Sequence, residues 1–124
     1  MAVAQKLDVI GWLLLAVLAS GLGVRLGRPL AGPFTGVHKL ASLLVLVFIA
    51  IRIVPVFRAF ASQHAFIDVA AVFVLSFVTA FTTGVLESIP SRAGALWLNL
   101  HRISAVATAI AAALAARLLF LAAR

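Results

Sequence analysis

The sequence predicts an all-α, polytopic integral membrane protein with four transmembrane helices in an up-down bundle. Of its 124 residues, 65% are hydrophobic and 10% are charged, and the mean hydropathy is +1.26, which is outside the range of soluble domains. A bilayer core needs roughly 20 apolar residues per helix. Four such segments use nearly all of the chain, so residues 1–124 are predicted to form a single transmembrane domain.

The first two helices are predicted over residues 8–24 and 36–57. The first apolar run lacks a convincing small-residue cleavage site, so we interpret it as a retained helix and not as a signal peptide. The segment "RLGRPLAGPFTG" (25–36) separates the two helices, and its Gly and Pro content predicts a loop. The second helix is expected to start close to His38 and to end at Arg58.

The third and fourth helices are predicted over residues 65–86 and 95–122, with "AFASQH" (59–64) and "ESIPSRAG" (87–94) as the connections before them. Asp8 and Asp68 then fall at the starts of the first and third helices. A carboxylate at a helix start complements the helix dipole, and this role is enough to explain both residues.

The two halves of the chain resemble each other. The segment at 8–24 can be superposed on 68–85, pairing Asp8 with Asp68, and "HKLAS" (38–42) then falls near "HRISA" (101–105) after a short gap. Two helices per repeat give both repeats the same orientation in the membrane. The likeness therefore favours two tandem two-helix repeats.

Two histidines are the candidate functional residues. His38 and His101 are predicted at similar depth in the second and fourth helices, which run parallel to each other. Two imidazoles facing each other across a bundle are a natural axial pair for a haem iron. Residues three and four positions after a ligand share its helix face. These positions hold small side chains that would admit a flat macrocycle: Ala41, Ser42, Ser104 and Ala105.

Cations on the histidine side of the membrane are candidate partners for haem propionates: Arg25, Arg28, Lys39, Arg92 and Arg102. The net charge of +7 is scattered over helix ends, where basic side chains reach headgroups, and so does not indicate nucleic-acid binding. The chain has no cysteine, which excludes thiolate ligands and iron–sulfur clusters. The alternative interpretation is that the histidines lie at the membrane interface and that the small residues only pack helices.

These motifs resemble the bacterial cytochrome b561 family of four-helix membrane haem proteins. The second-helix pattern "VHKLASLLVLVFIAIRIV" resembles that family's His-Lys pair, small residue, aliphatic run and Arg, and "LHRISAVATAIAAALAARLL" resembles its fourth helix. "IGWLLLAVLASGLG" and "HAFIDVAAVFVLSFVTAFTTGVL" are similar to its first and third helices. The family holds two haems with four histidines. Here Gly11 stands at the first-helix ligand position, and "LAARL" (114–118) contains no second histidine for the fourth helix.

The resemblance implies one bis-histidine haem b, held by His38 and His101. By analogy with the family, it also implies a bacterial inner-membrane location with the haem toward the extracytoplasmic side. The electron donor would be a membrane quinol or a partner redox subunit, and homo-oligomerisation is the other way to complete a relay. His64 has no second histidine at its depth, and we expect it to be interfacial or to act near a quinone.

Two other functions remain open at this point. The chain could be a non-catalytic structural subunit of a larger respiratory or photosynthetic complex, with histidines that pack or bind a chlorin. It could also be a small transporter, but transporters are expected to bury an acidic residue in mid-membrane. The three carboxylates here fall at predicted helix ends. Electron relay through a haem is the function that the sequence favours.

Overall fold

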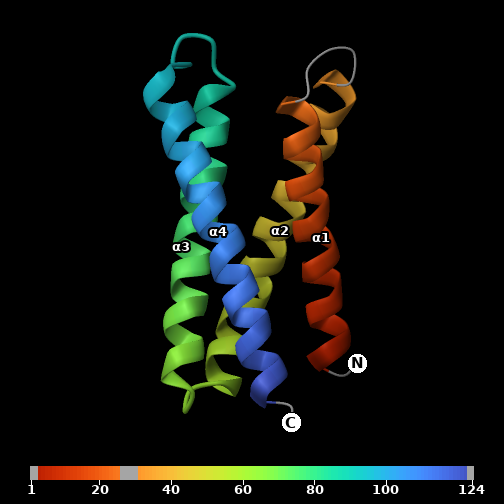
Figure 1. The fold of residues 1–124 in the computed structure, drawn as a ribbon, viewed down its shortest axis with the longest axis vertical. Coiled ribbons are helices and arrows are strands. Elements are labelled where there is room, and N and C mark those ends of the chain that lie inside the picture. The colour runs from red at the N-terminus through yellow and green to blue at the C-terminus, as the bar shows by residue number, and fades with distance from the viewer. Residues whose placement is uncertain (1–2, 26–30, 123–124) are drawn as a thin grey trace. The chain divides into compact units, whose positions relative to one another are not determined.

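A computed structural model describes residues 3–25 and 31–122, and the side chains of 11–25 and 32–121 within them. These residues form four α-helices joined by short connections (Figure 1). The helices are α1 (Val3–Arg25), α2 (Ala31–Ala59), α3 (His64–Glu87) and α4 (Ala95–Ala122). The prediction of an all-α chain with four helices is therefore confirmed. Arg28, one of the candidate propionate partners, lies outside the described residues.

Two helix starts differ from the prediction. The helix α2 begins at Ala31, so the part of the predicted loop from Ala31 to Gly36 is helical. Pro33 lies in the first turn, where backbone N–H groups have no partner within the helix, so proline is tolerated there. The helix α1 likewise begins at Val3, ahead of Asp8.

The capping role predicted for the two aspartates is wrong in the third helix. Because α3 begins at His64, Asp68 lies one turn inside the helix, and the first turn contains no acidic residue. Its side chain is exposed. In α1, Asp8 is also more than one turn past the start at Val3. Neither residue therefore lies at a helix N-terminus.

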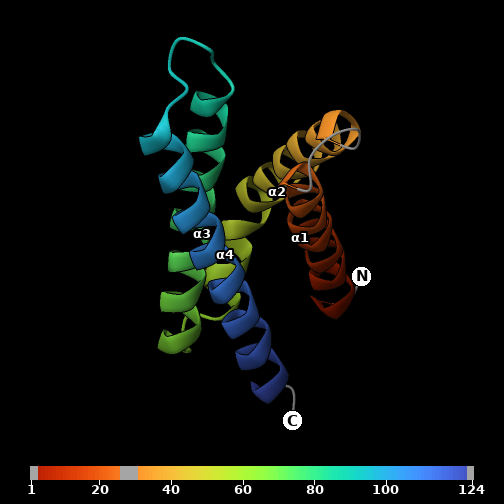
Figure 2. The same cartoon turned by 45° about the horizontal axis from the view of Figure 1, so that its top comes forward.

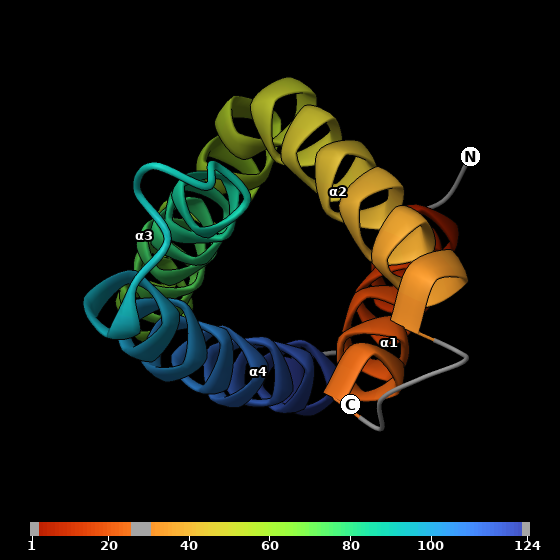
Figure 3. The ribbon, with the colours of Figure 1, turned by 90° about the horizontal axis from the view of Figure 1, so that it is seen from above.

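The chain divides into two compact units, Met1–Ile53 and Val54–Arg124. The first contains α1 and most of α2, which we call the N-terminal hairpin. The second contains α3 and α4, which we call the C-terminal hairpin. Within each hairpin the two helices run antiparallel, as the side views show (Figures 1 and 2), and Figure 3 shows α3 next to α4 when viewed from above. The unit boundary falls two residues before Pro55, inside α2.

Three helical spans are long and apolar enough to cross a membrane: Gly32–Ala59, His64–Glu87 and Ala95–Leu121. A shorter apolar stretch of α1 runs over Gly11–Arg25. Large apolar side chains such as Leu75 (69%) and Ile103 (67%) are mostly exposed. Apolar surface on this scale is unfavourable in water and favourable in lipid. The findings support an integral membrane protein.

In the C-terminal hairpin, α3 and α4 pack against each other along one buried face of each helix, and we call this contact the seam. On α3 the buried residues are Phe66, Phe77, Ala80 and Thr83, and on α4 they are Ser104, Thr108 and Ala111. The spacing of three and four residues in α4 is that of one helix face. Across the seam, the Thr108 hydroxyl oxygen lies 3.0 Å from that of Ser76 in α3. Interhelical hydroxyl contacts of this kind stabilise helix pairs in membranes.

The N-terminal hairpin packs along a similar line, to which α2 contributes apolar side chains. In α2 the buried residues are Ala41, Val45 and Ile49. Near the C-terminal end of α1, Gly23 lies under the ring of Phe34 from α2. A β-carbon at Gly23 would be only 2.7 Å from Phe34 Cγ. The absence of a side chain at Gly23 therefore lets this aromatic ring rest on the α1 backbone.

Candidate functional site

His101 is turned onto the neighbouring helix of its own hairpin. Its Nδ1 atom lies 2.7 Å from the carbonyl oxygen of Ala80 in α3. A carbonyl oxygen can only accept a hydrogen bond, so Nδ1 carries the proton and donates it. The lone pair of the neutral ring is therefore on Nε2, which is the atom that would bind a metal ion.

His38 makes the same contact in the N-terminal hairpin. Its Nδ1 lies 2.9 Å from the carbonyl oxygen of Val17 in α1 and 3.4 Å from the hydroxyl oxygen of Ser20. The carbonyl again requires a proton on Nδ1. Both histidines are thus fixed in the same tautomer by a helix backbone.

A glycine lies under each imidazole ring. A β-carbon at Gly21 would lie 3.1 Å from His38 Cε1 and 3.3 Å from its Nδ1, and one at Gly84 would lie 3.0 Å and 3.1 Å from the same atoms of His101. These separations are shorter than ordinary van der Waals contact. The glycines therefore provide the space in which each ring approaches the carbonyl one turn earlier.

A hydroxyl side chain precedes each glycine and donates mainly to the carbonyl four residues earlier in its own helix. The carbonyl that the imidazole contacts is a second, longer contact of the same hydroxyl. The Ser20 hydroxyl oxygen lies 3.2 Å from the Val17 carbonyl oxygen, and that of Thr83 lies 3.1 Å from the Ala80 carbonyl oxygen. Both hydroxyl residues are buried, with exposed fractions of 3% and 4%. Each carbonyl thus collects contacts from a histidine and a hydroxyl group.

The two sets of contacts are related by one constant spacing. Each histidine is 21 residues after the carbonyl it contacts, and every member of the first set recurs 63 positions later, as from His38 to His101. The superposition of Asp8 on Asp68 is therefore out of register by three residues in the helices that contact the histidines. The prediction that the two halves are alike is supported at this corrected spacing.

Burial follows the same spacing. Residues 38–43 and residues 101–106 have the same order of burial along the chain, which is half-buried, exposed, exposed, buried, half-buried and exposed. Residues 20–22 and 83–85 both run buried, half-buried, exposed. The histidines also lie at similar positions in their helices, as the eighth residue of α2 and the seventh of α4. Each histidine thus lies about two turns from the start of its own helix.

The four small residues predicted beside the histidines divide into two pairs. Ala41 and Ser104, three positions after each histidine, are buried, with 6% and 7% of their surface exposed. Ser42 and Ala105, four positions after, are half-buried. The Ser104 hydroxyl bonds within its own helix, to the Leu100 carbonyl. Because Ala41 and Ser104 are covered, Ser42 and Ala105 are the members of the set with surface left to contact a cofactor.

The predicted propionate partners are exposed at the same end of each hairpin. Arg25 is the last residue of α1, and Lys39 follows His38 in α2; both are exposed. Arg92 lies in the connection between α3 and α4, and Arg102 follows His101; both are also exposed. Each hairpin therefore offers two cations on the side of its histidine.

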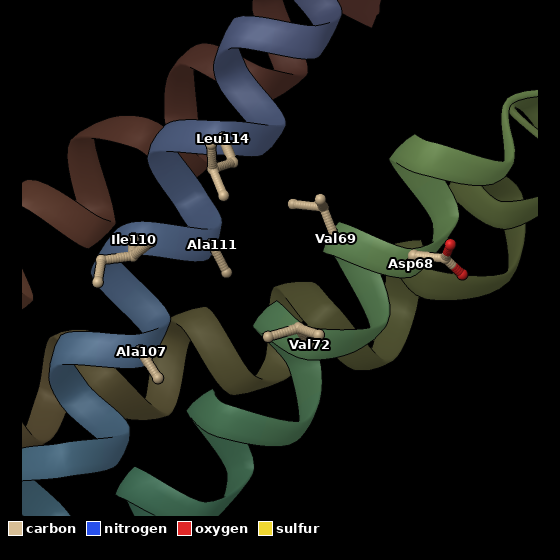
Figure 4. A pocket seen from close by; sticks show the side chains of 7 residues that line it. All are labelled: Asp68, Val69, Val72, Ala107, Ile110, Ala111 and Leu114. Carbon is tan, nitrogen blue, oxygen red and sulfur yellow. The ribbon is translucent and has the colours of Figure 1, made fainter.

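Two other features of the described chain do not join this site. His64 is the exposed first residue of α3. Within residues 11–25 and 32–121, no group of three His, Cys, Asp or Glu side chains lies close enough together to hold a metal ion. A groove of about 360 Å³ runs between α3 and α4 and contains no histidine (Figure 4). Its lining is apolar, and although Asp68 borders it, the Asp68 carboxylate points away from the groove. The residues around the groove are Asp68, Val69, Val72, Ala107, Ile110, Ala111 and Leu114.

Comparisons with protein-family models, with curated proteins and with solved structures give no match to this chain. Its function is therefore inferred from its own residues.

The carbonyl and glycine contacts are not among the features predicted from the sequence, although a signal for them is present. A Ser-Gly pair at 20–21 and a Thr-Gly pair at 83–84 each precede a histidine and a basic residue by the same interval of 16 residues. A hydroxyl residue, a glycine and a histidine at equal spacing in both halves are a more specific pattern than the histidines alone. A superposition that pairs the aspartates hides this pattern, because it shifts the register by three residues.

Proposed function

We propose that this chain is a membrane b-type cytochrome that relays electrons and that would hold one haem b through His38 and His101. The observation that carries the proposal is the contact of each ring's Nδ1 atom with a helix carbonyl. Both Nδ1 atoms donate to a helix carbonyl, so both rings have the metal-binding lone pair on Nε2. Metal-ligating histidines characteristically donate their other ring N–H to a carbonyl or carboxylate.

The haem would supply one-electron redox chemistry. Ligation by two histidines would favour electron transfer over oxygen chemistry. The chain's own contribution is to hold each ring in one orientation and one tautomer.

The other residues of the proposed site are assigned from how far their side chains are exposed. Ser42 and Ala105 keep part of their surface uncovered and would contact the macrocycle. Arg25 and Arg92 are exposed near the histidine ends of their hairpins, and a guanidinium pairs well with a propionate carboxylate. Lys39 and Arg102 are exposed as well and suit anionic lipid headgroups by the same chemistry.

The proposal includes a location and partners. By resemblance to the cytochrome b561 family, we propose a location in a bacterial inner membrane, with the haem toward the extracytoplasmic side. Because a single haem near one face cannot carry electrons across the whole membrane, we propose a quinol or a partner redox subunit as donor, or relay through a second copy of the chain.

The experiment is spectroscopic and uses the three histidines of the chain. The protein is purified in mild detergent from cells supplied with haem, and oxidised and dithionite-reduced visible spectra and the haem-to-chain ratio are recorded. We expect one haem per chain and a sharp α-band on reduction. His38→Ala and His101→Ala should each abolish or shift that band, and His64→Ala, the matched control, should leave it unchanged.

Each outcome bears on the proposal. Equal effects of His38→Ala and His101→Ala, with no effect of His64→Ala, would establish the two axial ligands. A chain that stays colourless in haem-replete cells would overturn the cytochrome and favour a structural subunit of a larger membrane complex. Loss of the band in only one of the two variants would exclude bis-histidine ligation by this pair.

A further inference from the structure

We propose that Gly21 and Gly84 are positioning residues. Each forms, with the histidine whose ring it contacts, one copy of an arrangement that orients the imidazole, which we call the device. The device consists of Ser or Thr followed by Gly on one helix and His followed by a basic residue on the next, with 16 residues between Gly and His. The binding of haem by Nε2 rests on the proposed function. The fixing of the ring and of its tautomer by the glycine and the carbonyl is independent of that function.

The glycine decides how closely the ring approaches the backbone. With a β-carbon in place, His101 Cε1 and Nδ1 would be 3.0 Å and 3.1 Å from it, so the ring would have to move by several tenths of an ångström. The carbonyl that the ring contacts belongs to Ala80, one turn before Gly84, and its hydrogen bond is 2.7 Å long. Displacement of the ring from Gly84 therefore strains or lengthens this bond.

The contact is specific to these two positions among the glycines in the described part of the chain. A β-carbon at Gly11, Gly32, Gly36 or Gly94 would meet nothing within 4 Å, and one at Gly23 would meet Phe34. Glycine is common in membrane helices because it lets two backbones approach. At Gly21 and Gly84 the nearest atoms are instead those of a histidine ring, so general helix packing does not account for them.

The preceding hydroxyl gives the device a second, weaker component. Ser20 and Thr83 both lie within hydrogen-bond distance of the carbonyl that accepts from the imidazole. Ser20 is also 3.4 Å from His38 Nδ1, a distance at which a hydrogen bond is weak. The carbonyl is therefore the main acceptor for the imidazole, and the hydroxyl, whose shorter hydrogen bond goes to the carbonyl four residues earlier in its own helix, is a secondary neighbour.

The test compares matched glycine substitutions in the full-length protein. Gly21→Ala and Gly84→Ala place a methyl group under one ring each, and Gly11→Ala and Gly36→Ala place the same group in open space in α1 and α2. The first readout is the tautomer of each histidine by ¹⁵N NMR of haem-free protein in detergent micelles. The second is haem affinity by titration. Ser20→Ala tests the contribution of the hydroxyl group separately from that of the glycine.

We expect Gly21→Ala to perturb the Nδ1–H signal of His38 and leave that of His101 unchanged, and Gly84→Ala to do the reverse. Each should weaken haem binding by about 10- to 100-fold, the range found when an outer-shell partner of a metal ligand is lost. Gly11→Ala and Gly36→Ala should change neither readout. Ser20→Ala should keep the Nδ1–H tautomer, because the Val17 carbonyl remains.

The outcomes separate the positioning role from the proposed function. If haem does not bind the wild-type protein but the two glycine variants each change their own histidine signal, the device stands and the cytochrome falls. If the imidazole signals of Gly21→Ala and Gly84→Ala match those of Gly11→Ala, the positioning role is overturned whatever the haem result. A loss of thermal stability without a change in tautomer would show a packing role only and would also overturn it.

Discussion

The Nδ1 atom of His101 lies 2.7 Å from the carbonyl oxygen of Ala80 on the neighbouring helix. In a membrane, a polar ring atom without a partner is costly because no water is available to replace the bond. A carbonyl within a helix already accepts from the N–H four residues later, and its second lone pair lets it accept from the ring as well. One backbone atom can thus satisfy, orient and fix the tautomer of a side chain in lipid.

The contact between Gly23 and Phe34 leads to a prediction about the stability of the N-terminal hairpin. A β-carbon at Gly23 would lie 2.7–2.9 Å from three atoms of the Phe34 ring, and Cγ is the ring atom least able to move. We expect Gly23→Ala to destabilise the protein by about 1–3 kcal/mol, the usual cost of overpacking. The measurement is thermal or denaturant unfolding in detergent.

Two further variants isolate the steric cause. Gly36→Ala adds the same methyl group in open space and should stabilise its helix by up to roughly 1 kcal/mol, because alanine is the better helix former. Phe34→Ala should remove most of the added cost of Gly23→Ala when the two are combined. A Gly23→Ala protein as stable as Gly36→Ala would contradict the close contact.

Much of the fold is accessible from the sequence because hydrophobic length alone dictates helices in lipid. The predicted bounds of α3 and α4 agree with the structure to within one residue at each end, since polar residues precede α3 and a charged connection with Gly and Pro separates α3 from α4. The predicted starts of α1 and α2 are wrong. Gly32 and Pro33 indicate a loop by composition, but they are compatible with a first helical turn, where the backbone donors are unpaired in any case.

The histidines of the candidate site are identifiable from the sequence, but the groups that hold them are not. A hydrogen bond from Nδ1 to the Val17 or Ala80 carbonyl leaves no trace in residue identity, because every residue has a carbonyl. The only signal is the hydroxyl-glycine pair at a constant spacing before each histidine, and a glycine taken alone is frequent in membrane helices for close packing. Ala41 and Ser104 lie near the histidines as predicted, but spacing alone does not reveal which side of the helix is covered.

The hydroxyl pair between α3 and α4 provides a second prediction. Thr108 Oγ1 lies 3.0 Å from Ser76 Oγ, the side-chain contact that joins the two helices at this level. Replacing Thr108 with the nearly isosteric Val should cost about 0.6 kcal/mol and at most roughly 1.7 kcal/mol, the range measured for interhelical hydrogen bonds in a membrane protein. Unfolding of the single and double variants of Ser76→Ala and Thr108→Val would give their coupling energy.

Thr79 supplies the control for this cycle. Its hydroxyl bonds to the Leu75 carbonyl within α3 and is exposed, so Thr79→Val should show no coupling to Thr108→Val. The interhelical hydrogen bond would be contradicted if the stability effects of Ser76→Ala and Thr108→Val were additive to within the error of the control pair. A bond between the two side chains must appear as non-additivity.

The exposed apolar face of α3 yields a third prediction, about membrane insertion. Leu75 lies at the middle of the span from His64 to Glu87 and is 69% exposed, so its side chain faces lipid if α3 crosses the bilayer. Leu75→Lys should then disfavour insertion of this helix by about 2.5–3.5 kcal/mol. Gln63→Lys, in the connection before α3, should have almost no effect. The inserted fraction can be measured by glycosylation of tagged loops on either side of the helix. Equal insertion of the two variants would mean that Leu75 is not at the centre of a membrane span, because a charge costs most at that depth and little at a helix end.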